Sequence, residues 1–324
     1  MTYTIILLHW GERETGNAGP EVPGKEDGGR SMNPFVICAD ASSDMPPDDL
    51  NARNVRIVPM TCLSRDEEPR ILTGFESEEE LIAFYREMRE GKMFSTSQIA
   101  PGEYEEIFRL IMGEGMDIIY LALSSGLTST VESARMAAEK LNRKMAPAKV
   151  YVVDTLSASG GINLLIEKAA GFRDEGMDSA QAAEKLAELA KRVCHVFMVT
   201  DLMHLSRGGR LSSTTAIVGT MLHVIPILII DEKGRLEVVD RKRGDRSAVR
   251  ELCKRFEDSW NREDHRMYCA HGNWPEEAVR AEQEILEYDP EARIEKRIIS
   301  PVIGAHTGPG MLGIIYFGDR SKIK

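Results

Sequence analysis

The sequence predicts an α/β protein: an N-terminal domain with a doubly wound, mostly parallel sheet, followed by a second, mixed α+β domain. Strand-like and helix-like runs alternate through the first half of the chain. Those strand-like runs are apolar at consecutive positions, which is typical of strands covered by helices on both faces. Near residue 178 the pattern changes to a long Ala-rich helix followed by strands that read as a hairpin. We therefore expect domains over residues 32–175 and 176–324.

Two helices in the N-terminal half have clear starting signals. Residues 77–80 (Ser-Glu-Glu-Glu) form a capping box, and apolar residues recur at helical spacing behind it. Pro101 fits the first turn of a helix whose apolar face includes Tyr104, Ile107 and Ile111. The other elements expected in this half are strands over residues 35–39, 55–60, 118–123 and 150–153, and helices over 130–141 and 160–173.

In the C-terminal half the clearest signal is a β-hairpin. Its strands cover residues 225–230 and 236–239, joined by a turn at 231–234 that contains Gly234. The other elements expected there are helices over 178–192, 246–259 and 275–287, and strands over 195–199, 266–270, 293–298 and 311–317.

The first residues of the chain lack any hydrophobic period. Residues 11–31 hold six glycines and two prolines, a composition typical of a linker or a disordered segment. We expect residues 1–31 to be a disordered extension, or translation to begin at Met32.

Charge and composition exclude several classes of function. The 324 residues include 41 Lys and Arg against 52 Asp and Glu, a formal net charge of −11. This balance disfavours a nucleic-acid-binding protein and a polybasic membrane anchor. Because no apolar run approaches the ~20 residues of a membrane span, we expect no stable membrane insertion. The five cysteines are widely spaced and show no zinc-ligand spacing, so we expect no metal and a cytoplasmic protein with reduced thiols.

Polar side chains follow several of the predicted strands. Hydroxyls and free N–H groups at the carboxyl ends of strands can form a shared crevice for a carboxylate or phosphate. Capping of helices explains any one of these turns equally well. The candidate residues are Asp40, Ser42, Thr61, Thr96, Ser97, Ser124, Ser125 and Gly126.

Basic residues and one histidine form further candidates. Arg207 and Arg210 flank two glycines, and residues 233–250 hold seven basic and three acidic side chains, which favours an acidic partner, a phosphate or an ordinary exposed hairpin. His306 lies in a segment dense with glycine and proline, which we expect to be a loop. A Ser97–His306 pair could serve a hydrolase, but no third residue is evident to orient the base.

The order of these motifs resembles the DegV family. The matching segments are VICADASSDMP, VPMT, MFSTSQIAPGEYEEIF, VYVVDTLSASGG, LSRGGRLS, LHVIPIL and IGAHTGPGMLG, between about residues 36 and 317. The resemblance implies two α/β domains with an elongated lipid pocket between them and a fatty acid as bound ligand. It also implies a partner, because the best understood members carry the acyl chain for a bacterial fatty-acid kinase.

The resemblance also implies roles for single residues. Thr61 and Ser97 match the hydroxyls that hold the ligand carboxylate, and His306 matches a histidine that closes on it. Arg210 and Arg243 match basic positions implicated in meeting the kinase.

Two departures stand out from the family pattern. Residues 128–131 read Thr-Ser-Thr-Val where the family has Ser-Gly-Thr-Tyr, and Ile225 replaces a lysine. Because neither departure touches the carboxylate-holding residues, ligand binding is better supported than the identity of the partner.

The leading hypothesis is a fatty-acid-binding protein that needs no cofactor, has no catalytic residues of its own and serves a separate kinase. The alternatives are a Ser/His hydrolase acting on an acyl ester, and a lipid carrier or sensor without a kinase.

Overall fold

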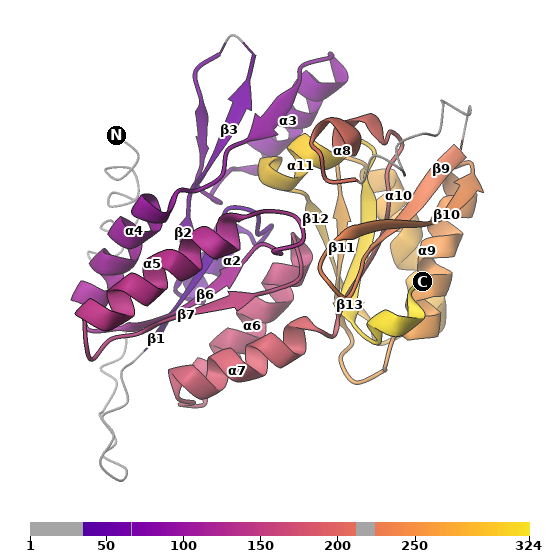
Figure 1. Cartoon of the computed structure of the whole chain (residues 1–324). Coiled ribbons are helices and arrows are strands. Elements are labelled where there is room, and N and C mark those ends of the chain that lie inside the picture. Colours follow the sequence, from indigo (N-terminus) through magenta and orange to yellow (C-terminus); the bar gives the residue numbers. More distant parts are fainter. Residues whose placement is uncertain (1–34, 66, 212–223) are drawn as a thin grey trace.

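The computed structural model describes residues 35–65, 67–211 and 224–324, which form two α/β halves that pack side by side (Figure 1). The first half contains a four-stranded sheet and a small three-stranded sheet, and the second contains a six-stranded sheet. The extension expected over residues 1–31 lies outside these ranges. Among the helices of the described ranges, none combines the length and apolar character needed to cross a bilayer.

The first sheet is parallel throughout and runs β2-β1-β6-β7. Helices α4 and α5 lie on one side of it, and α6 and α7 on the other (Figure 1). The two central strands, β1 and β6, are buried at every position, which explains their continuous apolar sequence. The elements are β1 (Phe35–Asp40), α2 (Pro47–Ala52), β2 (Val55–Val58), α4 (Pro101–Gly113), β6 (Asp117–Ala122), α5 (Thr130–Lys144), β7 (Val150–Asp154), α6 (Gly160–Asp174) and α7 (Ser179–Ala190).

The three-stranded antiparallel sheet is an element that the sequence did not predict. It runs β4-β3-β5, with β3 (Met60–Ser64), β4 (Arg70–Leu72) and β5 (Phe94–Thr96). The strand expected over residues 55–60 is wrong in its extent, because the chain changes sheet between β2 and β3 at Pro59, which has no N–H for the ladder. Helix α3 (Glu78–Arg89) starts at the predicted capping box on Ser77.

The third sheet is mixed and confirms the predicted fold class. It runs β10-β9-β8-β13-β11-β12, in which only the β11–β12 pair is parallel. The predicted hairpin is the β9–β10 pair, and α9 and α10 pack with the strands through a second apolar core. The elements are β8 (Val193–Met198), β9 (Val224–Ile230), β10 (Leu236–Arg243), α9 (Asp245–Ser259), β11 (Arg266–His271), α10 (Pro275–Tyr288), β12 (Arg293–Ile298) and β13 (Leu312–Phe317).

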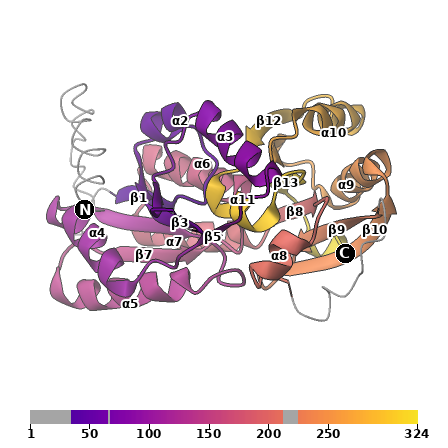
Figure 2. The same ribbon diagram turned by 90° about the horizontal axis from the view of Figure 1, so that it is seen from above.

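Two short helices from the C-terminal half complete the junction between the halves. Helix α11 (Pro301–Thr307) contacts β3, β5 and α3 of the first half, and it also contacts α8 (Met203–Arg207). Figure 2 shows α11 between these elements when the molecule is seen from above. The face of β8 that carries Phe197 joins the core of the first half, so one apolar core spans the junction.

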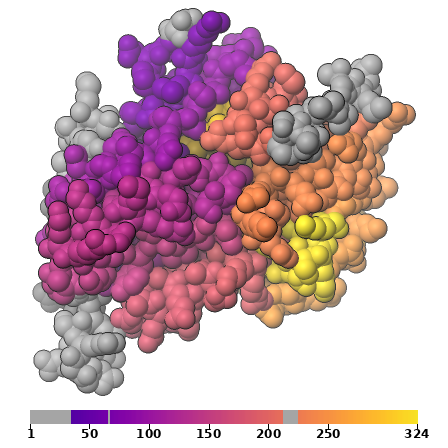
Figure 3. Space-filling view, viewed as in Figure 1, coloured from indigo at the N-terminus to yellow at the C-terminus, as the bar shows by residue number. Residues whose placement is uncertain are grey.

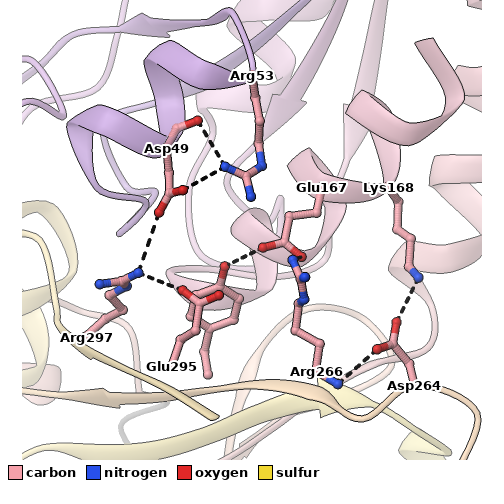
Figure 4. A network of polar contacts seen from close by, with 9 residues as sticks. Asp49, Arg53, Glu167, Lys168, Asp264, Arg266, Glu295 and Arg297 are labelled. Carbon is pink, nitrogen blue, oxygen red and sulfur yellow. Dashed lines mark hydrogen bonds and ion pairs between the residues drawn. The ribbon is translucent and has the colours of Figure 1, made fainter. Parts of the chain in front are cut away.

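Polar contacts also cross the junction, at a distance from α11. Figure 4 shows Lys168 of α6 paired with Asp264, at 2.8 Å. Glu167, the neighbour of Lys168, accepts a hydrogen bond from the Tyr268 hydroxyl at 2.8 Å. Elsewhere Arg320, in the 3-10 helix Arg320–Lys322, donates to the carbonyls of Val193, Asp231 and Leu156, which belong to three separate segments.

Candidate functional site

A cavity of about 510 Å³ lies between the two halves of the molecule. Figure 3 shows the surface of α11, in yellow, at the bottom of a hollow between the indigo N-terminal part and the salmon-coloured region of α8. Most of the cavity wall is apolar and comes from both halves of the molecule, which suits a hydrophobic ligand. The apolar lining residues are Met60, Leu123, Leu127, Ala158, Val196, Phe197, Leu205, Ile230, Leu236, Val302, Ile303, Met311 and Ile315.

Polar groups from three segments meet in one part of this wall. Thr96, at the end of β5, and Ser97 line the cavity together with His306 of α11 and Arg210, which follows α8. Thr96 Oγ1 lies 2.9 Å from His306 Nε2, a hydrogen bond that joins the two halves of the molecule. Chain segments more than 200 residues apart in sequence therefore build a single polar site.

The electrostatics of this site favour an anion. Burial, helped by the charge of Arg210, lowers the pKa of His306 to about 4, so the imidazole is neutral at neutral pH. Burial also lowers the pKa of Arg210, whose Nη1 donates to the Gly208 carbonyl at 2.5 Å. No carboxylate of the described residues forms an ion pair with Arg210. A partly buried arginine without a counter-charge, beside two hydroxyls, is suited to a carboxylate or phosphate.

His306 lies in a helix, whereas the sequence predicted a loop. Pro301 occupies the first turn of α11, where a missing N–H costs nothing. The helix ends at Gly308, whose φ of +76° is easily reached only by glycine. Glycine and proline thus act here as helix boundaries. Gly208 is required for another reason, because a Cβ there would lie 2.5 Å from His306 Nδ1.

Of the other candidates, Ser125 and Gly126 also line the cavity. A Cβ on Gly126 would lie 2.3 Å from the Gly234 carbonyl oxygen, so only glycine permits this close approach of the β9–β10 turn. Ser124 does not line the cavity, and its Oγ donates to that same Gly234 carbonyl at 2.8 Å.

Three of the predicted residues support the site from outside the cavity wall. Thr61 lies in β3, where its carbonyl accepts a hydrogen bond from Ser97 N–H at 3.0 Å. Asp40 is fully buried and accepts hydrogen bonds from the backbone N–H groups of Ser42 and Leu123, both at 3.0 Å. These contacts fix the carboxyl ends of β1 and β6, so Asp40 and Ser42 shape the loops around the site.

The two departures from the family pattern lie in different surroundings. Thr128 and Ser129 line the cavity just before α5, and Gln98 Nε2 donates to Ser133 Oγ at 2.9 Å beside them. Ile225 is buried in the core under α9, so the position that lacks the lysine does not face the cavity.

Arg243 lies at the end of β10, outside the cavity. It borders a separate surface hollow together with Arg246, Arg250 and Arg280. Arg243, Arg246 and Arg250 are exposed, and within the described part of the chain they form no ion pair. Arg210 and Arg243, which the sequence analysis grouped together, therefore occupy different environments.

His195 of β8 lines the cavity, which the sequence did not predict. From the sequence, this histidine was expected only to begin a strand. A single histidine in the apolar run VCHVFM was the available signal.

The geometry offers little support for hydrolysis or for a metal centre. His306 Nε2 is hydrogen-bonded to Thr96 Oγ1, and among the described residues no carboxylate orients the imidazole ring. In the same ranges, no group of His, Cys, Asp and Glu is arranged to hold a metal ion.

The fold and the cavity define a class: a two-part α/β protein with an apolar ligand cavity at the junction and a polar, cationic site in its wall. The model of the DegV family of uncharacterised proteins matches residues 34–319, and the chain belongs to this family. A DegV domain-containing protein of Clostridium perfringens is 32% identical over 292 residues, covering 90% of this chain and 100% of the relative.

Solved structures agree with this assignment. A DegV family protein from Thermus thermophilus, described by its fatty acid binding, is 28% identical with a TM-score of 0.77 and covers 89% of this chain and 100% of its own. DegV from Bacillus subtilis, described as a fatty acid binding protein, is 28% identical with a TM-score of 0.74 over the same shares of the two chains.

Proposed function

We propose that the protein binds a long-chain fatty acid in the cavity and holds its carboxylate at Ser97, Thr96, His306 and Arg210. The observation that carries this proposal is Arg210, which has no carboxylate partner among the described residues and lies in the wall of a mostly apolar cavity. Two structural neighbours described as binding fatty acids support it.

The energetics of such a ligand fit the cavity. Each buried methylene contributes about 0.8 kcal/mol, so a long chain gains most of its affinity from the apolar wall. Burying the carboxylate unpaired would offset much of that gain. Hydroxyls and a guanidinium compensate the charge, and the neutral imidazole can donate a hydrogen bond when its proton lies on the nitrogen that faces the ligand.

Native mass spectrometry of the purified protein, followed by denaturing extraction, tests this function. We expect about one fatty acid per chain, and the extract identifies its length and saturation. A protein that carries no lipid and fails to take up added fatty acids would contradict the proposal. Turnover of an acyl ester that depends on Ser97 and His306 would instead favour the hydrolase.

We further propose that the protein catalyses nothing alone and presents the carboxylate to a separate fatty-acid kinase in the cytoplasm. Three exposed arginines at this hollow, Arg243, Arg246 and Arg250, support this step. They form no ion pair with the described residues and outnumber the acidic Asp245 and Glu277 beside them, which suits an acidic protein surface. A kinase from the same organism should phosphorylate the bound fatty acid, and a lipid carrier without a kinase would show no such reaction.

Charge reversal separates docking from lipid binding. Arg243→Glu should weaken kinase coupling at least tenfold while fatty-acid affinity stays unchanged, since Arg243 lies outside the cavity. Arg109→Glu, at an exposed position of α4 in the other half, is the control and should change neither; unlike Arg243, Arg109 pairs with a carboxylate, Glu105, at 3.5 Å. Loss of both lipid binding and coupling in Arg243→Glu would indicate misfolding.

A further inference from the structure

A buried carboxylate behind the cavity wall joins the two halves of the molecule. Asp44 follows β1 and is only 9% exposed. One of its oxygens accepts a hydrogen bond from Ser159 Oγ of the first half, and the other accepts from the backbone N–H of Ser300 of the second half, at 2.7 Å. Burial raises the pKa of Asp44 to about 6, so the carboxylate is ionised at neutral pH and both oxygens can accept.

The first partner, Ser159, belongs to the cavity wall. Its backbone has a φ of +57° and a ψ of −133°, a conformation that is costly for a residue with a side chain and persists only where the surroundings hold it. Two contacts do so, because its N–H donates to the Ser42 carbonyl at 3.1 Å and its hydroxyl donates to Asp44. Helix α6 begins at the next residue, so Asp44 also helps to fix the start of that helix.

The second partner, Ser300, directly precedes α11, a helix of seven residues that carries His306 near its other end. The Tyr85 hydroxyl donates to the neighbouring Ile299 carbonyl at 3.0 Å, so two side chains of the first half hold the entry to α11. At the far end of the helix, Thr96 Oγ1 lies 2.9 Å from His306 Nε2. The first half therefore holds α11 at both ends, and a shift of its first turn would displace the imidazole.

We propose that Asp44 is a positioning residue for the carboxylate site. By binding Ser159 and Ser300 at once, its carboxylate keeps α11, and with it His306, in place against the part of the wall that the first half supplies. Without the carboxylate, the Ser300 N–H loses its acceptor and the first turn of α11 is free to move. The effect on lipid affinity rests on the proposed fatty-acid binding, whereas the effect on His306 does not.

A second buried carboxylate offers a matched control. Asp117 is 6% exposed and, like Asp44, accepts from one serine hydroxyl and one backbone N–H. These donors are Ser179 Oγ, at 2.6 Å, and the N–H of Lys149, at 2.8 Å. All three residues belong to the first half, and none of them lines the cavity. Asp117→Ala should therefore lower the stability of the fold, as Asp44→Ala does, and leave the carboxylate site in place.

Two measurements on the full-length protein test the proposal. The first records the imidazole NMR signals of His306 after lipid has been removed, with His306→Gln to assign them. Asp44→Ala should shift these signals, and Asp117→Ala should leave them where they are in the unchanged protein.

The second measurement is the affinity for octadecanoic acid, obtained by displacement of a fluorescent fatty acid. Asp44→Ala should bind about three- to tenfold more weakly than the unchanged protein. Asp44→Asn should recover most of this loss, because the amide oxygen still accepts from the Ser300 N–H. Asp117→Ala should bind normally.

The outcomes separate the positioning role from the proposed function. Unchanged His306 signals in Asp44→Ala overturn the positioning role, and so do equal effects of Asp44→Ala and Asp117→Ala on both readouts. Shifted signals in a protein that binds no octadecanoic acid support the positioning role and contradict the proposed function. Shifted signals with an unchanged affinity overturn the role in ligand binding.

A second pair of variants keeps the test decisive if Asp44→Ala does not fold. Ser159→Ala removes one of the two donors to Asp44, and Ser179→Ala removes the matching donor to Asp117. We expect Ser159→Ala to weaken the affinity about twofold or more, and Ser179→Ala to leave it unchanged. Equal affinities of these two variants would then overturn the proposal.

Discussion

Within the part of the chain that the structure describes, the polar site contains a cation but no counter-charge. Arg210 has no carboxylate partner among the described residues, and His306 beside it is neutral at neutral pH. Thr96 holds the imidazole through a 2.9 Å contact, which leaves the hydroxyl of Ser97 available to a ligand. In the fatty-acid complex that we propose, the arginine supplies charge and Ser97 supplies a directional hydrogen bond.

The role of Ser97 is testable with one substitution. Ser97→Ala should weaken fatty-acid binding about tenfold or more, because a hydrogen bond to a charged group contributes about 1.5–3 kcal/mol. The dissociation constant can be measured by displacement of a fluorescent fatty acid. Ser129→Ala, which removes a hydroxyl from another part of the same cavity wall, is the control and should change the affinity little. An unchanged affinity in Ser97→Ala would remove Ser97 from the site.

Arg210 should act on the lipid itself as well as on any partner. Arg210→Met removes the charge from the cavity wall, so we expect at least a tenfold loss of fatty-acid affinity in the absence of a kinase. Arg207→Met, an exposed arginine at the end of α8, should bind the lipid normally. If Arg210→Met retains full affinity and loses only kinase coupling, Arg210 belongs to the docking surface alone.

At the scale of elements, helix α6 supports the cavity wall through its first turn. A Cβ on Gly161 would meet the His195 ring at 2.6 Å, whereas a Cβ on Gly171 of the same helix would have no atom within 4 Å. The close approach of the helix to β8 therefore depends on a residue without a side chain.

These two glycines allow a matched comparison. Gly161→Ala should lower the free energy of unfolding by about 1–3 kcal/mol, the usual cost of overpacking. Gly171→Ala should leave it unchanged or raise it by up to about 1 kcal/mol, because alanine favours the helix. Urea unfolding measures both. Equal stability of the two variants would mean that the imidazole moves aside without cost.

Local signals explain which elements could be predicted. The capping box at Ser77 and the proline at Pro101 specify helix starts through contacts within one turn, and both helices begin there. The strands β3, β4 and β5 have no comparable signal, since they are short, and β5 pairs with β3 only after the whole of α3 has intervened in the chain. The candidate site follows the same rule. Ser97 and His306 were named from local sequence patterns, and the family resemblance supplied their expected roles, whereas the cavity position of His195 depends on how the two halves pack.

At the scale of the whole molecule, buried polar groups hold the halves together. Asp44, next to β1, accepts hydrogen bonds from Ser159 Oγ and, at 2.7 Å, from the backbone N–H of Ser300 in the other half. Arg320 ties three carbonyls from separate segments. Both groups are buried, so packing of the halves is coupled to the ionisation state of the junction.

This coupling predicts that acid weakens the fold before most surface carboxylates titrate. His195, His271 and His306 have pKa values of about 3, 4 and 4, lowered from 6.5 mainly by burial. As the pH falls, these histidines are protonated in the unfolded chain at a higher pH than in the folded protein. Their contribution to the free energy of unfolding is therefore complete above pH 6.5 and is lost as the pH falls. Asp44 opposes this loss, because burial raises its pKa from 3.8 to about 6 and the folded state takes up a proton there.

Histidines with lowered pKa values, His204 included, bind protons when the chain unfolds. Carboxyl groups whose pKa burial raises release protons on unfolding and oppose this effect; they are Asp40, Asp44, Glu76 and Glu277. We expect the histidines to set the sign, so the free energy of unfolding should fall between about pH 6 and pH 5. His271→Gln removes one of the protons taken up on unfolding and should reduce this slope. Asp44→Asn removes the opposing group and should make the slope steeper. Urea unfolding across this pH range measures all three proteins, and identical slopes would show that these groups titrate alike in the folded and unfolded states.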